Sequence, residues 1–260
     1  MKIEFLINGR GELYGFKTSD EEEEVEELRI PSIVNGVKVT SILKKFRESS
    51  IMLYLNGVRK INRLLIEDGI EEIQACAFSL IDIKITTVHW PRTCLTIPFR
   101  CFSGSNIETI VGIENVKEIE PYAFKDTLLK KISWPSRCKT VPDSCFYRCH
   151  NLEQIDGLEV IINIGEDAFQ RSGIKTFLCP ASVSVAEASA FLEGCENLEG
   201  IRFEGTGIKD VDLEYFFFLK NIKKIDFSGL AAVNLINCSS PKGREVRDKV
   251  VLPYYVTEIN

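Results

Sequence analysis

The sequence predicts a solenoid, in which short repeats stack along one axis and each repeat adds one strand to a parallel β-sheet. Two recurring motifs and one nearly constant spacing support this prediction. The first motif is apolar-x-x-apolar-x-x-x-x-Phe, the second is apolar-x-x-apolar-x-apolar, and successive phenylalanines of the complete first motifs lie 22 to 25 residues apart. Because a repeat this short cannot bury its apolar side alone, the copies must stack on one another.

The first motif recurs seven times with the same final spacing, and its phenylalanines are expected to form a ladder in the core. The copies are Ile70/Ile73/Phe78, Cys94/Ile97/Phe102, Val116/Ile119/Phe124, Cys138/Val141/Phe146, Ile161/Ile164/Phe169, Val183/Ala186/Phe191 and Ile208/Val211/Phe216. Val39/Ile42/Phe46 is one residue shorter, and Val256/Ile259 has no phenylalanine after it.

The second motif lies between copies of the first and predicts one short strand per repeat. Its last two apolar positions are two residues apart, which is the period of a strand with one buried face, and Pro or Gly often ends it. The copies begin at Ile61, Ile85, Ile107, Leu129, Leu152, Ile174, Leu198 and Ile222. Trp90, Trp134 and Cys179 occupy its last position and are therefore expected in the core.

The two motifs divide the chain into three segments. Residues 1–24 are expected to form a β-hairpin cap around Asn8-Gly9-Arg10-Gly11, because an open solenoid end exposes core and strand edges. Residues 25–237 are the solenoid of about eight repeats, with Asn35-Gly36 as a tight turn and an insertion near 47–60. Residues 238–260 hold a basic loop, Lys242 to Lys249, and a half repeat.

These residues resemble the BspA-like, or Treponema pallidum-type, leucine-rich repeat family. The resemblance covers roughly residues 25 to 260 and is carried by residues 134–152 and their sibling repeats, which follow the family's Pro, Ala-Phe, Cys and Leu framework. Cys145 replaces the usual Ala, which Ala77, Ala123, Ala168 and Ala190 keep. The resemblance implies a leucine-rich repeat solenoid with a concave parallel sheet and with short strands or turns on the convex side. It also implies a role as a surface adhesin or host-interaction protein.

Composition excludes several classes of protein. A net charge of −6 and a pI near 5.3 give no positive field for nucleic acid. The longest apolar runs, such as Ile51 to Leu55, fall far short of the roughly 18 residues of a membrane span. Residues 1–7 are too short for a secretion signal, and nine cysteines is an odd number, so a cytoplasmic location is expected; the alternative is the cell surface or secretion.

The sequence contains no recognisable catalytic, cofactor or metal motif, and we therefore expect no enzyme. Most cysteines fall on apolar positions of the repeat and are expected to behave as small buried hydrophobes. The sharper alternative is a metal or haem site at Cys145, Cys149 and His150, whose spacing fits neither zinc nor c-type haem. The acidic residues Asp20 to Glu24, Glu26 and Glu27 are expected to form a solvated loop, with a docking patch for a basic partner as the alternative.

The open side of the sheet is the expected interaction surface. Strand alternation sends the residues between the inward ones to this face, and solenoids commonly bind partners there. We therefore predict a non-enzymatic scaffold that binds a protein partner, with an unused solvated sheet as the alternative. The predicted binding residues are Arg63, Leu65, Thr87, His89, Thr109, Val111, Lys131, Ser133, Gln154, Asp156, Thr176, Leu178, Arg202, Lys224 and Asp226.

Overall fold

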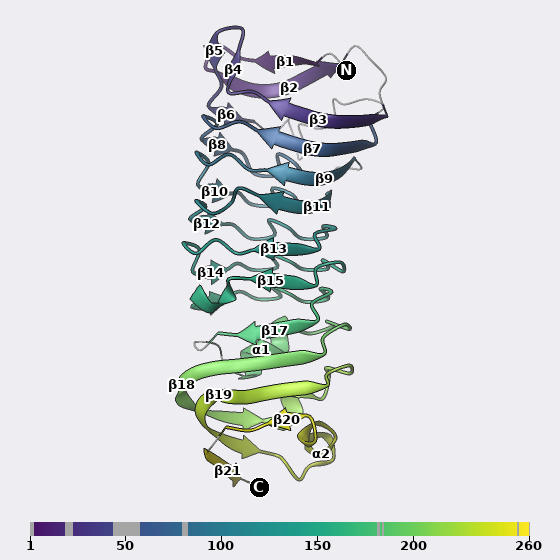
Figure 1. The fold of residues 1–260 in the computed structure, drawn as a ribbon, viewed down its shortest axis with the longest axis vertical. Coiled ribbons are helices and arrows are strands. Elements are labelled where there is room, and N and C mark those ends of the chain that lie inside the picture. The colour runs from purple at the N-terminus through teal and green to yellow at the C-terminus, as the bar shows by residue number, and fades with distance from the viewer. Residues whose placement is uncertain are drawn as a thin grey trace. The chain divides into compact units, whose positions relative to one another are not determined.

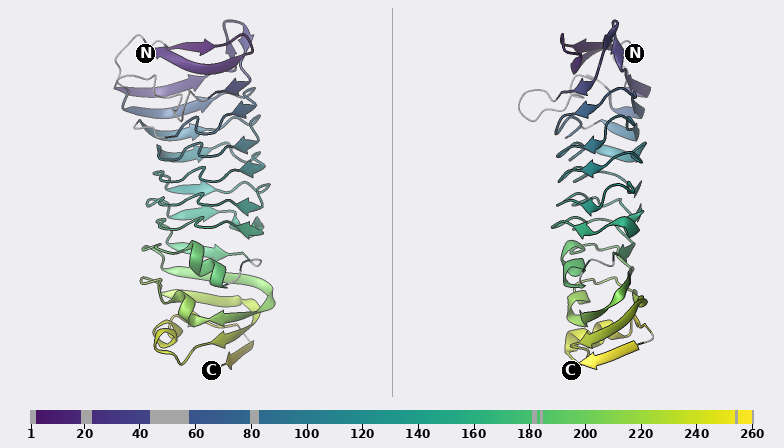
Figure 2. Two further views of the ribbon diagram at one scale, coloured as in Figure 1. Left: turned by 180° about the vertical axis from the view of Figure 1, so that it is seen from behind. Right: turned by 90° about the vertical axis from the view of Figure 1, so that its left-hand side faces the viewer.

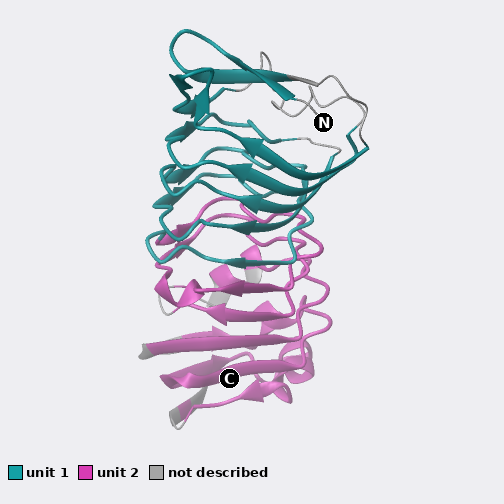
Figure 3. Ribbon diagram, turned by 45° about the horizontal axis from the view of Figure 1, so that its top comes forward, with its two compact units in different colours: residues 1–138 teal, residues 139–260 magenta. Residues whose placement is uncertain are grey.

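A computed structural model describes residues 3–18, 23–43, 58–79, 83–180, 183, 185–253 and 255–259. The chain forms two compact units, residues 1–138 and 139–260 (Figure 3). Each unit is built from successive coils of the chain, and the strands of neighbouring coils pair in parallel (Figure 1). The predicted leucine-rich repeat β-solenoid is therefore confirmed.

The main sheet of unit 1 consists of the longer strands. Neighbouring strands are parallel and pair in the order β11, β9, β7, β3, and β13 contacts β11. The strands are β3 (Glu24–Ile30), β7 (Lys60–Ile66), β9 (Lys84–His89), β11 (Asn106–Val111) and β13 (Lys131–Ser133). The register places Leu28 beside Leu64 and Leu64 beside Val88, and all three are buried. The inward positions of the second motif thus line up from coil to coil.

A second file of short strands lies on the other side of the coils (Figure 2). It contains β6 (Ser41–Ile42), β8 (Glu72–Ile73), β10 (Thr96–Ile97) and β12 (Glu118–Ile119). The N-terminal hairpin consists of β1 (Ile3–Ile7) and β2 (Glu12–Thr18), and β2 pairs in parallel with β6. The hairpin thus extends the short-strand file, as expected of a cap. Strands β4 (Ile33–Val34) and β5 (Val37–Lys38) flank the expected Asn35-Gly36 turn.

The core of unit 1 contains the predicted phenylalanine ladder. The rings of Phe78 and Phe102 are stacked with centroids 5.5 Å apart, and Phe102 stacks on Phe124 at 5.8 Å. Trp90 packs edge-on against Phe102, and its indole Nε1 donates a buried hydrogen bond of 3.0 Å to the carbonyl of Cys94. Because a buried indole N–H needs an acceptor, this bond explains how a Trp is accommodated inside the coil.

Unit 2 is built from the same repeats, but it also contains longer strands and two α-helices. Its strands and helices are β14 (Thr140–Val141), β15 (Gln154–Asp156), the 3-10 helix η2 (Leu158–Val160), β16 (Asn163–Ile164), β17 (Thr176–Cys179), α1 (Val185–Phe191), β18 (Gly200–Asp212), the 3-10 helix η3 (Leu213–Phe216), β19 (Lys224–Ile236), α2 (Pro241–Arg247), β20 (Val250–Val251) and β21 (Tyr255–Ile259). Parallel pairing runs from β17 through β18 and β19 to β20, while β21 also pairs with β19. The ladder rings of Phe146 and Phe169 are stacked at 5.7 Å.

The sequence predicts a loop for the acidic segment near the N-terminus, but part of this segment is a strand. Residues 19–22 lie outside the described residues, but Glu24, Glu26 and Glu27 belong to strand β3. The physical reason is that Val25, Leu28 and Ile30 repeat the spacing of the second motif and are buried. Their burial places this segment in the sheet despite its charge.

Unit 2 also departs from the expected short strands and loops. Helix α1 stands where the repeat predicts a short strand. Alanine occupies every second position of this segment, and it favours a helix because it is the strongest helix former. Strands β18 and β19 each run for 13 residues, and no proline interrupts them. The predicted basic loop contains helix α2, which begins after Ser240, whose Oγ accepts a 2.9 Å hydrogen bond from Gly243 N, with Pro241 at its first turn. The expected insertion near 47–60 lies mostly in residues 44–57, outside the described residues.

Candidate functional site

The open face of unit 1 is the candidate functional surface, defined as the side of the β3, β7, β9 and β11 sheet that points away from the core. Strand register aligns its predicted residues in two rows. One row contains Arg63, Thr87 and Thr109, and the other contains Leu65, His89 and Val111. All six are exposed or half-buried. Strand β3 adds Glu27 to the first row and Arg29 to the second.

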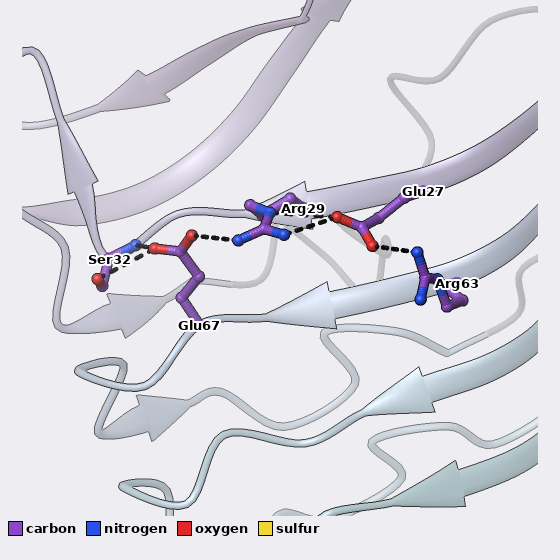
Figure 4. Close-up of polar contacts among 5 residues, drawn as sticks. All are labelled: Glu27, Arg29, Ser32, Arg63 and Glu67. Atoms are coloured by element: carbon purple, nitrogen blue, oxygen red, sulfur yellow. Dashed lines mark hydrogen bonds and ion pairs between the residues drawn. The ribbon is translucent and has the colours of Figure 1, made fainter.

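Charged side chains at the β3 end of this face form a connected network (Figure 4). Glu27 pairs with Arg29 and with Arg63, each at 2.9 Å, and Arg29 reaches Glu67 at 3.3 Å. The Glu67 carboxylate also accepts hydrogen bonds from Ser32 N at 2.9 Å and Ser32 Oγ at 3.2 Å. These bonds, led by the one from the Ser32 backbone N–H, lower the pKa of Glu67 below its ordinary value. The network therefore joins two neighbouring strands through paired charges.

A second set of ion pairs links neighbouring coils near the N-terminal ends of the strands. Glu24 pairs with Lys60, while Glu108 pairs with Lys84 at 2.7 Å and with Lys130 at 3.2 Å. The hydrogen bond from Lys84 is the main reason that the pKa of Glu108 is lowered. These charges at this edge are thus paired with the opposite charge on an adjacent coil.

Two threonines, one histidine and two aliphatic side chains form the middle of the open face. Thr87, Thr109, Leu65, His89 and Val111 lie there between the paired charges. Beyond the end of β11, a hollow of about 270 Å³ is lined by Val111, Ser133 and the segments around Ile113 and Trp134. The side chain of Val111 is 37% exposed, which makes it an accessible apolar point beside this hollow. Lys131 and Ser133, on β13, are both exposed.

In unit 2 the predicted residues occupy the corresponding face of β17, β18 and β19. Thr176 and Lys224 lie in one row, with Gly200 between them, while Leu178, Arg202 and Asp226 form the other. Gln154 and Asp156 lie on β15 and are both exposed.

Asp226 differs from the other predicted residues because it is buried. Its carboxylate accepts hydrogen bonds from Lys224 Nζ at 2.8 Å and from Ser228 N and Oγ at 2.9 and 2.6 Å. The bond from Lys224, followed by that from Ser228 Oγ, lowers the pKa of Asp226 to about 2. Local donors thus already occupy the Asp226 carboxylate, which makes it less accessible to a partner than the other predicted residues.

The cysteine positions offer no metal centre among the described residues. Cys145 and Cys149 are buried, whereas His150 is exposed, and no three His, Cys, Asp or Glu side chains in the described ranges could hold a metal ion together. Burial raises the pKa of the Cys94 and Cys138 thiols to about 11. Within the part of the chain that is described, no helix has the length and apolar character needed to cross a membrane.

Sequence reasoning missed the contribution of β3 to this face. The signal was present, since Val25-x-x-Leu28-x-Ile30 matches the second motif, but the surrounding glutamates made the segment resemble a loop. Glu67 was missed for another reason. Its role depends on Ser32, a residue 35 positions away whose proximity only the folded coil creates.

Short coils, a phenylalanine ladder and a parallel sheet define the class as a leucine-rich repeat solenoid. A family model described as "BspA type Leucine rich repeat region" matches residues 71–199 and 117–237. The chain belongs to the BspA-type leucine-rich repeat family.

Solved structures of bacterial leucine-rich repeat proteins resemble this one. A leucine-rich cell surface protein from Faecalibacterium prausnitzii is 17% identical with a TM-score of 0.55, and the match covers 97% of this chain and 70% of that chain. A leucine-rich repeat protein from Bacteroides ovatus is 16% identical with a TM-score of 0.48, covering 100% and 89%. The leucine-rich repeat protein of T. pallidum is 14% identical with a TM-score of 0.37, covering 96% of each chain. No curated protein sequence matches the chain.

Proposed function

We propose that this protein is a non-enzymatic recognition module that binds a protein partner through the open face of unit 1. The observation that carries the proposal is the in-register arrangement of Arg63, Thr87 and Thr109 beside Leu65, His89 and Val111 on one exposed sheet surface. Such a surface offers hydrogen-bonding and apolar side chains on rigid strands, which suits partner recognition.

The ion-pair network favours this surface over a flexible one. Glu27, Arg29, Arg63 and Glu67 hold one another across β3 and β7, so their side chains lose little further freedom when a partner binds. Ordering long side chains at an interface costs about 0.5 to 1.5 kcal/mol each, and a preformed network avoids part of that cost.

The proposed location is the cell surface, rather than the cytoplasm that the cysteine count suggested. The similar F. prausnitzii structure is that of a cell surface protein, and the family resemblance implies the same setting. Free cysteines do not argue against it, because eight of the nine are buried and burial raises the pKa of several thiols, which slows their oxidation.

The binding proposal is tested by affinity purification from the native cells with the purified chain as bait. Thr87→Glu combined with Thr109→Glu adds two negative charges to the open face, and Lys117→Glu, which alters the exposed opposite side by the same charge, is the matched control. We expect the wild type and the control to capture the same protein and the double variant to lose it. A double variant that keeps every partner would contradict the proposal.

Location is tested separately by labelling intact native cells with a membrane-impermeant amine reagent. Exposed lysines such as Lys117 and Lys220 are expected to be labelled before lysis. Labelling only after lysis would exclude the surface location without affecting the binding proposal.

A further inference from the structure

Phe218 departs from the pattern at its position in the repeat. The position two residues after each ladder phenylalanine holds a polar residue or glycine in the five copies that precede it: Gly104, Asp126, Arg148, Arg171 and Glu193. The first complete copy has Leu80 there, a residue outside the described ranges. After Phe216 the position holds Phe218, whose side chain is 69% exposed. Since five consecutive copies fold with a polar residue or glycine at this position, the fold itself does not require a phenylalanine there.

A hollow of about 560 Å³ lies beside Phe218 within unit 2. It is formed by the loops that follow Phe169, Phe191 and Phe216, so three consecutive coils contribute to it. Exposed aromatic side chains beside a concave surface are typical anchors for partners. The Phe218 ring also packs edge-on against Phe217, with centroids 5.7 Å apart.

Three cations lie in the lining of this hollow or beside the Phe218 ring. Arg171 and Lys220 line the hollow, and neither forms an ion pair with another residue in the described ranges. Lys242 of α2 lies with Nζ 5.7 Å from the centre of the Phe218 ring. Of the two acids in the lining, Glu193 accepts a hydrogen bond of 3.2 Å from Gln170. Glu196 is the second acid, so the lining itself holds two cations and two acids, and Lys242 adds a third cation beside the Phe218 ring.

We infer that this hollow binds a peptide segment in which a large apolar side chain lies next to an acidic one. The apolar side chain covers the Phe218 ring and removes it from water, while the carboxylate reaches Arg171 and Lys220. The site lies in unit 2 and uses none of the residues of the proposed open-face surface in unit 1, so the two sites are independent.

The test uses a random peptide library displayed on phage, selected on the full chain and depleted on Phe218→Ser. Selected peptides are synthesised and measured by calorimetry. We expect enrichment of an acidic residue beside an aliphatic or aromatic one, and an affinity loss of about tenfold or more for Phe218→Ser. Lys220→Glu should weaken the same peptides and strengthen versions whose acidic residue is replaced by lysine. Ile162→Ser, which changes a similarly exposed apolar side chain of unit 2 away from the hollow, is the matched control and should bind normally.

Several results would overturn the inference. These are a selection without enrichment, selected peptides that are basic or uncharged, and equal binding by the wild type and Phe218→Ser. Binding of the chain to vesicles containing phosphatidylserine that Phe218→Ser abolishes, without any peptide binding, would assign the surface to an anionic bilayer instead. Because Lys220 is exposed, Lys220→Glu keeps the test decisive even if Phe218→Ser is poorly folded.

Discussion

The rings of Phe102 and Phe124 lie parallel, with an angle of 2° between their planes and 5.8 Å between their centroids. These residues are 22 positions apart in the sequence and equivalent in the repeat. The contact therefore depends on the register between two coils, since a shift of one coil against the next would separate the rings.

Replacing Phe102 tests how strongly the ladder stabilises unit 1. Phe102→Ala removes a fully buried ring that contacts Phe78, Phe124 and Trp90, and should lower the free energy of unfolding by about 3 to 5 kcal/mol. Phe218→Ala, at an exposed position, should change it by less than about 0.5 kcal/mol. Urea denaturation measures the free energy of unfolding of both variants. Equal losses would show that the ladder ring stabilises the fold no more than an exposed ring does.

A double-mutant cycle tests whether Glu27 and Arg63 are coupled across β3 and β7. The two side chains are partly exposed, so the coupling should be at most about 1 kcal/mol and should shrink as salt is added. The measurement is the unfolding free energy of Glu27→Gln, Arg63→Gln and the double variant at low and high salt. Strict additivity at low salt would mean that the pair does not stabilise the face.

Asp226 should make unit 2 sensitive to acid. Its pKa is lowered to about 2 in the folded state, compared with about 3.9 in an unfolded chain. A depressed folded pKa gives stability that is present above the unfolded value and is lost as pH falls towards the folded pKa. Because Lys224 is exposed, we expect only on the order of 1 kcal/mol. Asp226→Asn should reduce stability at pH 7 and flatten the decline between about pH 4 and 2; an unchanged pH profile would refute this.

Gly173 is required by the close approach of two coils in unit 2. A Cβ atom there would lie 2.0 Å from the carbonyl oxygen of His150, and Gly173 N donates a 3.0 Å hydrogen bond to the carbonyl of Cys149. Gly173→Ala should therefore lower the melting temperature by several degrees. Gly9→Ala, where no atom lies within 4 Å of the added carbon, is the control. Identical melting curves for the two variants would contradict this packing.

Thiol reactivity should follow burial. Cys76 is half-buried, whereas the other eight cysteines are buried. With a pKa of about 11, only about one Cys94 thiol in a thousand is ionised at pH 8, so alkylation is slow. Iodoacetamide treatment of the native chain, read out by peptide mass spectrometry, should label Cys76 first and all nine only after unfolding. Rapid native labelling of Cys94 or Cys138 would disprove their burial.

The sequence by itself determined the repeat, its inward residues and the N-terminal hairpin. Residues such as Ile85, Val88 and Phe102 could be placed in the core because burial on one side of a strand imposes a spacing that is visible in a single chain. The Asn35-Gly36 turn was likewise readable, because its backbone angles suit few other residues: both have positive φ, at 50° and 80°.

Only the tertiary structure decided which polar groups meet. Glu67 contacts Ser32 and Glu27 contacts Arg63 because the register between coils brings these distant positions together. The hydrogen bonds of Asp226 stay within its own strand, to Lys224 and Ser228, and the apolar pattern does not reveal them. The same holds for Phe218, whose surroundings come from three coils. Apolar periodicity is a local property of each repeat, whereas polar contacts depend on how far each loop shifts one coil against the next.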